Sequence, residues 1–235
     1  MNIIITGASK GFGKAIADKF SGDKQGHTLL LCARDKQLLD ESSKEMQARY
    51  PRSNIKTRQC DISKKEQLRG FADWILKEVP KIDVLVNNAG HFIPGSVNNE
   101  EEGVLEKMIE TNLYGAYHLT RMLLPRMMEH KSGYIINICS IASLKAYDNG
   151  GAYSISKFAL AGFSKNLREE MKPHGIKVTA VYPGAAYTDS WAGTGIDPKR
   201  IMEAKDIAEI IYTITCLSPQ ACIEDIIIRP QLGDL

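Results

Sequence analysis

Residues 2–13 read NIIITGASKGFG, an apolar run that ends in a turn with three glycines. The run Ile3-Ile4-Ile5 is typical of a strand buried on both faces, and the amphipathic stretch over residues 11–21 predicts a helix directly after the turn. Glycines between a strand and a helix let the backbone approach a pyrophosphate, whose charge faces the helix N-terminus. The stretch therefore predicts a dinucleotide site, although an ordinary tight turn would give the same glycines on its own.

The rest of the chain alternates short β-branched runs with longer amphipathic stretches. Because parallel strands need helical crossovers, this pattern predicts an α/β fold, a single-domain doubly wound parallel sheet of the Rossmann type over residues 1–235, with helices on both faces. The ligand crevice is expected at the carboxyl ends of the strands. Residues 183–205, rich in Gly, Ala and Tyr, are predicted to form a surface loop or lid. The seven expected strands are residues 2–6, 28–33, 55–59, 84–87, 134–139, 177–182 and 226–229, and the expected helices are residues 11–21, 36–49, 64–78, 105–129, 152–172 and 204–217.

The composition is that of an ordinary globular protein. Of the 235 residues, 43% are hydrophobic and 25% charged, and the net charge of +2 gives no strong field for nucleic acid or a membrane surface. The 5 cysteines contain no C-x-x-C pair, which argues for a reducing compartment and against disulfides or a zinc site. The first apolar run is too short for a signal sequence or a membrane span. We therefore expect a cytoplasmic location, a small-molecule substrate, no metal, and no nucleic-acid or membrane partner.

The end of the second expected strand bears on the choice between NAD and NADP. An NAD site usually has an acidic residue there, which holds the ribose 2′-hydroxyl. Here the strand ends in Cys32-Ala33-Arg34-Asp35, with Ala33 at the acidic position. Arg34 is suited to pair with a 2′-phosphate, and Lys10 in the glycine turn adds a second positive charge, so NADP(H) is predicted over NAD(H). Two solvated surface cations would also fit the pattern, and Asp35 partly offsets their charge.

A tyrosine and a lysine four residues apart stand near the start of the fifth expected helix, in Tyr153-Ser154-Ile155-Ser156-Lys157. Residues at this spacing share one helix face. A free tyrosine titrates near ~10 and is a poor base at neutral pH, but a nearby ammonium stabilises the phenolate and lowers the tyrosine pKa. The pair is therefore a candidate for proton transfer, whereas on its own such a spacing usually means a partly exposed helix face.

These features stand in a fixed order with several others, and the sequence resembles the short-chain dehydrogenase/reductase family over essentially its whole length. The matching pieces, in chain order, are residues 6–13, Asp61-Ile62, Asn87-Asn88-Ala89-Gly90, Asn112, Ser140, Tyr153 with Lys157, and Pro183-Gly184 with Thr188. Two positions depart from the family pattern. Phe12 stands where the family usually has a small aliphatic residue, and Ala186 where it often has valine. Both positions act mostly through backbone, so cofactor binding is expected to survive.

The resemblance implies a role for each matched residue. Ser140 would hydrogen-bond the substrate carbonyl, Tyr153 would donate or accept the proton, and Lys157 would hold the nicotinamide ribose and lower the tyrosine pKa. Asn112 would anchor a water that links Lys157 to solvent. Asp61 and Ile62 would meet the adenine, Asn87 to Gly90 the adenosine ribose, and Ala186 and Thr188 the nicotinamide. The implied NADP(H)-binding set is Gly7, Ser9, Lys10, Gly11, Phe12, Gly13, Arg34, Asp61, Ile62, Asn87, Ala89, Gly90, Tyr153, Lys157, Pro183, Gly184, Ala186 and Thr188. The family also implies a homo-oligomer, a dimer or a tetramer.

The substrate is less clearly encoded. Residues 226–230 and 233–235 of the carboxyl tail, with residues 186–191, resemble the sepiapterin reductase branch of the family. If the tail covers the pocket, Asp234 would accept two hydrogen bonds from the amino-pyrimidine edge of a pterin; a frayed terminus is the alternative. A ketone or a sugar-derived carbonyl would also fit. The candidate pocket residues are largely apolar and aromatic: Phe92, Ile93, Ile141, Ala142, Tyr147, Tyr187 and Trp191.

Two further groups of residues call for an interpretation. His91 follows Asn88-Ala89-Gly90 and is a candidate substrate contact, whereas the other four histidines are predicted to be structural or on the surface. Glu100-Glu101-Glu102 is predicted to be the solvated start of a helix, where the helix dipole favours acidic side chains.

The leading hypothesis is an NADPH-dependent carbonyl reductase or alcohol dehydrogenase with a Ser-Tyr-Lys-Asn site. The alternatives are an NAD-dependent alcohol dehydrogenase and a dinucleotide-sensing protein without catalysis. Loss of Ser140, Tyr153 or Lys157 would favour the sensing protein, and all three are present. A methyltransferase on a related sheet would use glycines in a similar way but gives no reason for this set of residues.

Overall fold

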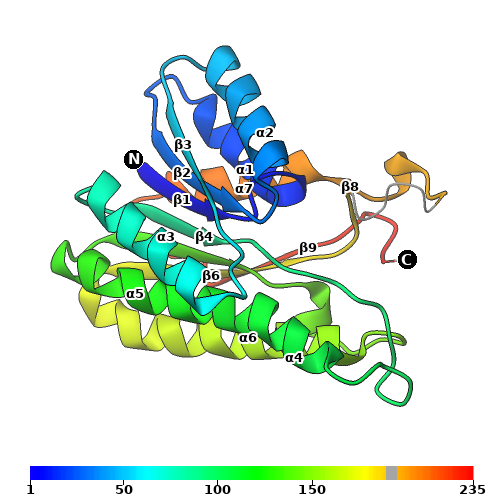
Figure 1. Ribbon diagram of the computed structural model, residues 1–235. Coiled ribbons are helices and arrows are strands. Elements are labelled where there is room, and N and C mark those ends of the chain that lie inside the picture. Colours follow the sequence, from blue (N-terminus) through cyan, green and yellow to red (C-terminus); the bar gives the residue numbers. More distant parts are fainter. Residues whose placement is uncertain (189–194, 235) are drawn as a thin grey trace.

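The computed structural model describes residues 1–188 and 195–234. Its centre is a seven-stranded sheet in the order β3-β2-β1-β4-β5-β6-β9, in which every pairing is parallel (Figure 1). The chain order reverses between β1 and β4, and a doubly wound sheet opens its ligand crevice at such a point. The strands are β1 (Asn2–Thr6), β2 (Thr28–Ala33), β3 (Asn54–Gln59), β4 (Val84–Asn87), β5 (Gly133–Ile138), β6 (Ile176–Pro183) and β9 (Asp225–Ile228).

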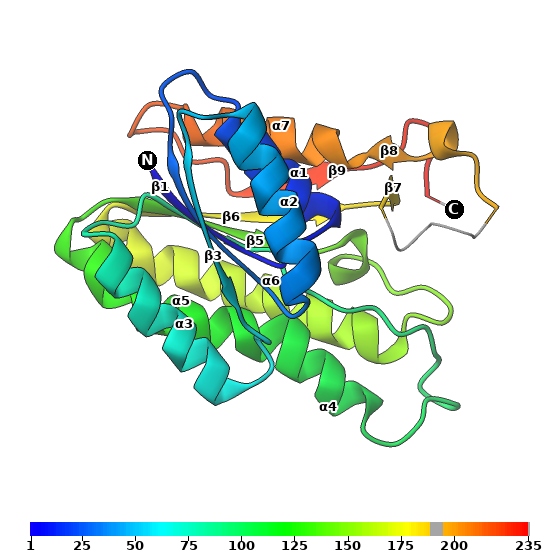
Figure 2. The same cartoon turned by 45° about the horizontal axis from the view of Figure 1, so that its top comes forward.

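Helices cover both faces of this sheet. One face carries α1 (Gly11–Ser21), α2 (Lys36–Arg49) and α7 (Ala204–Thr215), and the other carries α3 (Lys65–Glu78), α5 (Gly115–Glu129) and α6 (Gly151–Met171), as Figures 1 and 2 show from two directions. Alternate side chains of β1 enter the two hydrophobic cores, Ile3 and Ile5 on the side of α1 and Ile4 on the side of α3. All three isoleucines are fully buried, which explains the uninterrupted apolar run that opens the sequence.

The predicted fold is confirmed, and most element boundaries agree within one or two residues. The prediction of one helix over residues 105–129 has to be corrected. The structure divides this stretch into α4 (Val104–Ile109), a π-helical turn (Glu110–Tyr114) and α5. Such turns insert an extra residue and often mark functional positions. Apolar periodicity does not reveal them, since the apolar face continues on either side.

The segment predicted as a loop over residues 183–205 contains regular structure where it is described. Strands β7 (Ala186–Tyr187) and β8 (Met202–Glu203) pair in parallel, and a 3₁₀ turn spans Pro198–Arg200. Two-residue strands leave too short a pattern for prediction from sequence. Trp191 lies outside the described residues, as do the other residues from 189 to 194 and Leu235.

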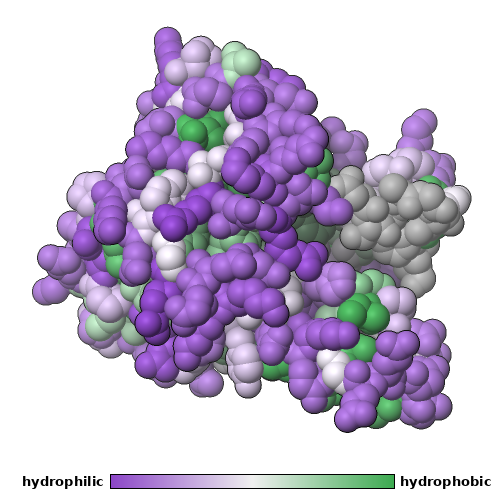
Figure 3. Space-filling model, viewed as in Figure 1, coloured by the Kyte–Doolittle hydropathy of each residue, from purple (hydrophilic) through white to green (hydrophobic). Residues whose placement is uncertain are grey.

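The surface seen in Figure 3 is mainly hydrophilic. Apolar side chains gather at its lower right, in the region that α4 and the loop before it occupy in Figure 1. Phe92 and Val97 in that loop and Leu105 in α4 are among the exposed large hydrophobic residues. None of the described helices has the length and apolar character needed to cross a membrane.

Candidate active site

The glycine turn between β1 and α1 is held by groups from the end of β4. The Thr6 hydroxyl accepts the backbone N–H of Asn88 at 3.0 Å and that of Ala89 at 3.0 Å, and the Asn88 side chain donates to the carbonyls of Thr6 at 2.8 Å and Gly7 at 3.1 Å. Gly7 has φ +67°, and a Cβ on Gly13 would lie 2.2 Å from the Gly7 oxygen. Only glycine fits these two positions, so the turn presents bare backbone toward the crevice, as a pyrophosphate site requires.

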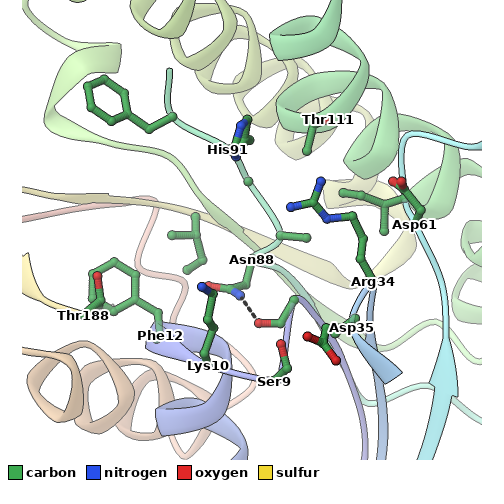
Figure 4. A pocket seen from close by; sticks show the side chains of 18 of the residues that line it. Ser9, Lys10, Phe12, Arg34, Asp35, Asp61, Asn88, His91, Thr111 and Thr188 are labelled. Carbon is green, nitrogen blue, oxygen red and sulfur yellow. Dashed lines mark hydrogen bonds between the residues drawn. The ribbon is translucent and has the colours of Figure 1, made fainter. Parts of the chain in front are cut away.

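A cavity of about 460 Å³ opens beside this turn at the carboxyl ends of β1, β2 and β4 (Figure 4). It joins the glycine turn to the end of β2, the loops after β3 and β4, and the start of α6. Among the predicted cofactor residues, the lining includes Gly7, Ser9, Lys10, Gly11, Phe12, Arg34, Asp61, Ile62, Ala89, Gly90, Tyr153, Lys157 and Thr188. The structure thus brings most of the predicted set together around one cavity.

Arg34 and Asp35 stand side by side at the cavity but have different roles. The Asp35 carboxylate caps α2 by accepting the backbone N–H of Leu38 at 3.0 Å. The exposed Arg34 side chain reaches into the cavity (Figure 4). The negative charge of Asp35 is therefore directed to the N-terminus of α2, which it stabilises, and the guanidinium faces the cavity.

Other members of the predicted set lie elsewhere. Asn87 is only 3% exposed, and its side chain points into the sheet, where it donates to Thr120 at 3.0 Å and to Asn137 at 2.8 Å. The Asn87 side chain is therefore turned away from the cavity, which its neighbour Asn88 lines instead, and the contact of residues 87–90 with the adenosine ribose stays a prediction. Gly13 acts through the tight turn. Pro183, the last residue of β6, and Gly184 and Ala186 after it stand outside the described lining of the cavity.

Tyr153 and Lys157 both reach the cavity from the first turns of α6. The Lys157 side chain is buried, its ammonium donates to the Ile138 carbonyl at 2.8 Å, and it lies 5.9 Å from the centre of the Tyr153 ring. Burial disfavours the charged amine and lowers the pKa of Lys157 to about 8. The lysine is therefore close to its titration point at neutral pH.

The predicted lowering of the Tyr153 pKa is not met in this structure. Burial of the phenol is the largest effect and raises the pKa, while interaction with the Ser140 side chain acts in the opposite direction. Phe92 packs edge-on against the Tyr153 ring at 4.9 Å between ring centres, which adds to this burial. A protonated Tyr153 is a proton donor, and this is the form that the geometry favours.

Ser140 is placed by the turn that follows β5. Its hydroxyl accepts the backbone N–H of Ala142 at 3.1 Å, and its own backbone N–H donates to the Ser143 hydroxyl at 3.2 Å, so that the two serines cap the short 3₁₀ helix Ile141–Ser143 reciprocally. This capping box restricts the Ser140 rotamer. The Ser140 hydroxyl is held next to the Tyr153 phenol, and its O–H is left to donate to a nearby acceptor.

Asn112 lies in the π-helical turn between α4 and α5 and is 1% exposed. Its side chain accepts the backbone N–H of His91 at 2.7 Å and donates to the His91 carbonyl at 2.9 Å and to the Ser156 hydroxyl at 2.9 Å. Asn112 therefore ties the loop after β4 to α6. Its predicted water-anchoring role stays a prediction.

The arrangement agrees with the comparisons to known proteins. The family model described as short chain dehydrogenase matches residues 1–198. The chain belongs to the short-chain dehydrogenase family. Sepiapterin reductase from Chlorobaculum tepidum is 32% identical over 239 residues, which cover 99% of this chain and 97% of that protein.

Solved short-chain dehydrogenase structures superpose closely on this one. A metagenomic short-chain oxidoreductase in complex with NADP is 31% identical with a TM-score of 0.84 and covers 99% of this chain and 98% of its own. Alcohol dehydrogenase from the archaeon Thermococcus sibiricus, complexed with 5-hydroxy-NADP, is 25% identical with a TM-score of 0.90 and covers 100% and 98%. The oxidoreductase fold is therefore shared over the whole chain.

The predicted substrate residues of this short-chain dehydrogenase differ in exposure. Phe92, Tyr147 and Tyr187 are 47%, 46% and 39% exposed, whereas Ala142 is buried in the turn after Ser140. Phe92 and His91 line the cavity. Burial, with Arg34 as a second cause, lowers the pKa of His91. The exposed ring of Phe92, which packs against Tyr153, is suited to an apolar or planar substrate.

The carboxyl tail is held by arginines through residue 234. Arg200 donates to the carbonyls of Gly233 at 3.0 Å and Asp234 at 3.3 Å, and Arg229 pairs with one oxygen of the Asp234 carboxylate. The second oxygen, Oδ1, is buried against Gly184 without a hydrogen-bond partner among the described residues. The structure shows an anchored tail rather than a frayed one, and the Asp234 oxygen that lacks a partner is closed off from the surface.

Prediction from sequence omitted three residues that organise the site. Thr6 and Asn88 hold the glycine turn, and both stand inside matched motifs, so the motifs contained the signal. Glu100 was predicted to be a solvated helix start, but it contacts a different helix, α6, whose Ala152 N–H it accepts at 2.7 Å. A contact between residues 52 positions apart leaves no local pattern.

Proposed function

We propose that this short-chain dehydrogenase is an NADPH-dependent carbonyl reductase that also runs in reverse as an alcohol dehydrogenase. The observation that carries the proposal is that Tyr153 and the buried Lys157 line the dinucleotide cavity side by side, with Ser140 next to the phenol. A protonated phenol and a placed hydroxyl are the two donors that a carbonyl oxygen needs when it gains negative charge.

The residues around the cavity fit an NADP(H) molecule. The turn at Gly7 and Gly13 leaves no room for a Cβ, and this space suits a pyrophosphate against the N-terminus of α1. Arg34 faces the cavity where a 2′-phosphate would meet it, and three structural neighbours were crystallised with NADP or a derivative of it. When bound, NADPH supplies the hydride.

Three side chains would handle the substrate oxygen. Ser140 donates a hydrogen bond to this oxygen and so orients the carbonyl toward Tyr153. Tyr153 donates the proton that converts the developing alkoxide into an alcohol. The Lys157 ammonium then stabilises the phenolate left on Tyr153, since an opposite charge lowers the cost of that anion. In the oxidative direction Tyr153 accepts the proton instead.

A pterin side-chain ketone is the substrate class we favour. The support is the 32% identity with a sepiapterin reductase and the exposed rings of Phe92 and Tyr147. A planar pterin would stack on the rings, and the Asp234 carboxylate would accept one N–H of its amino-pyrimidine edge once the tail exposes the Oδ1 that lies buried against Gly184. We further propose a cytoplasmic homo-oligomer, by analogy with the family.

The test of the activity is a panel of ketones, diketones, sugar-derived carbonyls and pterin ketones, followed by NADPH and NADH oxidation at 340 nm. We expect turnover of at least one carbonyl with NADPH and much slower turnover with NADH. Binding of NADPH without turnover of any carbonyl or alcohol would favour the dinucleotide-sensing protein, and equal rates with both cofactors would favour an NAD-dependent alcohol dehydrogenase.

The pterin assignment has its own test in Asp234→Asn. This variant should lose ~10- to 100-fold in kcat/KM on a pterin ketone, or ~1–3 kcal/mol, because a charged acceptor is replaced by a neutral one. A plain diketone is the matched control and should be reduced as by the unmodified protein. A parallel loss on both substrates would show that the tail only supports the fold.

A further inference from the structure

Glu100 connects the loop after β4 to the helix that carries Tyr153. It is partly buried, and its Oε1 accepts the backbone N–H of Ala152 at 2.7 Å, one residue before Tyr153. Its carboxylate also lies against two glycines. A Cβ on Gly151 would stand 2.1 Å from Oε1, and a Cβ on Gly95 would stand 2.6 Å from the Glu100 Cγ. The carboxylate therefore occupies a space that these glycines keep open.

Helix α6 needs such a partner because it begins without a cap of its own. Its N-cap residue is Gly150, which has no side chain to cap the helix, its first residue is Gly151, and its first turn contains no acidic residue. The first N–H groups of a helix are left unsatisfied and carry partial positive charge. Glu100 supplies both an acceptor and a negative charge from 52 residues away. Glycines without a cap would otherwise leave this end of α6 prone to fraying.

The same loop is bound to the segment before α6 by three more contacts. Gly95 forms a parallel bridge with Gly150, its N–H donates to the Asn149 carbonyl at 3.2 Å, and the Ser96 hydroxyl donates to the Asn149 side chain at 3.1 Å. The loop begins at His91 and Phe92, which line the cavity, and Phe92 packs on Tyr153. The loop thus contacts the Tyr153 ring through Phe92 and the backbone amide just before it, that of Ala152, through Glu100.

We propose that Glu100 is a positioning residue for the proton donor: by capping α6 it sets the position of Tyr153 relative to Ser140 and the substrate carbonyl. This inference rests on the proposed function for its consequence on catalysis, whereas the cap itself is tested independently of activity. Proton transfer is sensitive to displacements of well under the length of a hydrogen bond, so a frayed first turn reduces kcat. The glycine turn, Arg34 and Asp61 lie on other elements, and Lys157 lies beyond the first turn of α6, so we expect little change in NADPH affinity.

The test compares Glu100→Ala, Glu100→Gln and Glu101→Ala. Glu100→Ala removes the acceptor and should lower kcat at least tenfold, with the NADPH dissociation constant unchanged within twofold and faster hydrogen exchange at the Ala152 and Tyr153 amides. Glu100→Gln keeps an oxygen at the same position and should restore kcat to within threefold of the unmodified protein. Glu101→Ala changes the exposed neighbour and serves as the matched control.

A general loss of protein stability must also be distinguished from a displacement of Tyr153. Tyr212→Phe removes a hydrogen bond to Asp23 at the far end of the sheet and should lower the melting temperature without lowering kcat. The proposal is overturned if Glu100→Ala keeps its kcat, if its amide exchange is unchanged, or if Glu100→Gln is as impaired as Glu100→Ala. Should Tyr153→Phe retain activity, the proposed function fails, and exchange at Ala152 still decides whether Glu100 caps α6.

Discussion

The two ends of the sheet each place a tyrosine beside charged groups, with opposite results. At the amino end, the Tyr212 hydroxyl donates to Asp23 at 2.6 Å, and Lys19, which lies 4.8 Å from the centre of the Tyr212 ring, is paired with Glu209 at 2.5 Å. At the carboxyl end, Tyr153 lies beside the buried ammonium of Lys157, whose hydrogen bond goes to a backbone carbonyl. The charges at the amino end are balanced by counter-charges, whereas Lys157 makes no ion pair with any of the described residues and donates to a backbone carbonyl.

The titration behaviour follows from this difference. The hydrogen bond to Asp23 raises the pKa of Tyr212, and backbone and side-chain hydrogen bonds lower the pKa of Asp23 to about 2, so both groups keep their ordinary charges at neutral pH. Burial lowers the pKa of Lys157 to about 8, near the working range. A tyrosine next to charged groups is therefore not an active site by itself. The carboxyl end differs because its lysine is buried at a cavity without an ion-pair partner among the described residues.

The largest effect that would sharpen this contrast is expected from Ser140→Ala. Loss of a hydroxyl placed for the substrate oxygen should reduce kcat by ~10²- to 10³-fold, the usual cost of removing one such donor. Steady-state kinetics on the best carbonyl of the panel measures it. Ser53→Ala is the control from the amino end: Ser53 is also buried and donates to the Ser21 carbonyl at 2.9 Å, and its loss should reduce stability and leave kcat unchanged. Similar kcat losses in both variants would remove the distinction.

Next in size is the pH dependence of stability that Lys157 imposes. Its pKa is about 8 in the folded protein and 10.5 as a free side chain, so the penalty for burying the ammonium is fully present below pH 8 and disappears as pH rises to 10.5. Relative to Lys157→Met, the unmodified protein should therefore gain on the order of 3 kcal/mol of unfolding free energy over this range. Urea unfolding of both proteins at several pH values measures the difference. A constant difference from pH 7 to 10.5 would mean that Lys157 is not buried as a cation.

A smaller effect is expected at Arg34, at the outer part of the same cavity. Arg34→Ala should weaken NADPH binding about tenfold, or ~1.4 kcal/mol, and barely change NADH binding, because only NADPH has a phosphate for the guanidinium. Fluorescence titration gives both dissociation constants. Lys36→Ala, two residues further along and exposed, is a matched control that also removes one positive charge. Equal losses for NADPH and NADH would contradict the assignment.

How much of this could be predicted from the sequence depends on the range of the contacts. The buried strands, the glycine turn and the Tyr153–Lys157 spacing are local patterns, and the structure has them where the sequence predicts them. Motif matching placed Arg34, Asp61 and Ser140 at the same crevice because the carboxyl ends of parallel strands meet there.

The remainder depends on contacts between distant segments. Asn87 and Asn88 are adjacent and alike in sequence, but successive side chains near a strand end point in opposite directions, one into the sheet and the other to the glycine turn. Glu100 stands in an acidic run typical of a solvated helix start, and only folding brings it to Ala152. The direction of the Tyr153 pKa also had to come from the structure, since the sequence shows the neighbouring Lys157 but not the burial that raises this pKa.

The central claim is that Tyr153, and not merely a tyrosine near charges, donates the proton during carbonyl reduction. The most direct test is single-turnover NADPH oxidation, in which preformed complexes of the unmodified protein, Tyr153→Phe and Tyr212→Phe with NADPH are mixed with the best carbonyl substrate in a stopped-flow spectrophotometer. We predict that Tyr153→Phe binds NADPH with unchanged affinity but oxidises it at least ~10²-fold more slowly, the usual contribution of a general acid, while Tyr212→Phe matches the unmodified protein. Oxidation by Tyr153→Phe at the unmodified rate would contradict the claim.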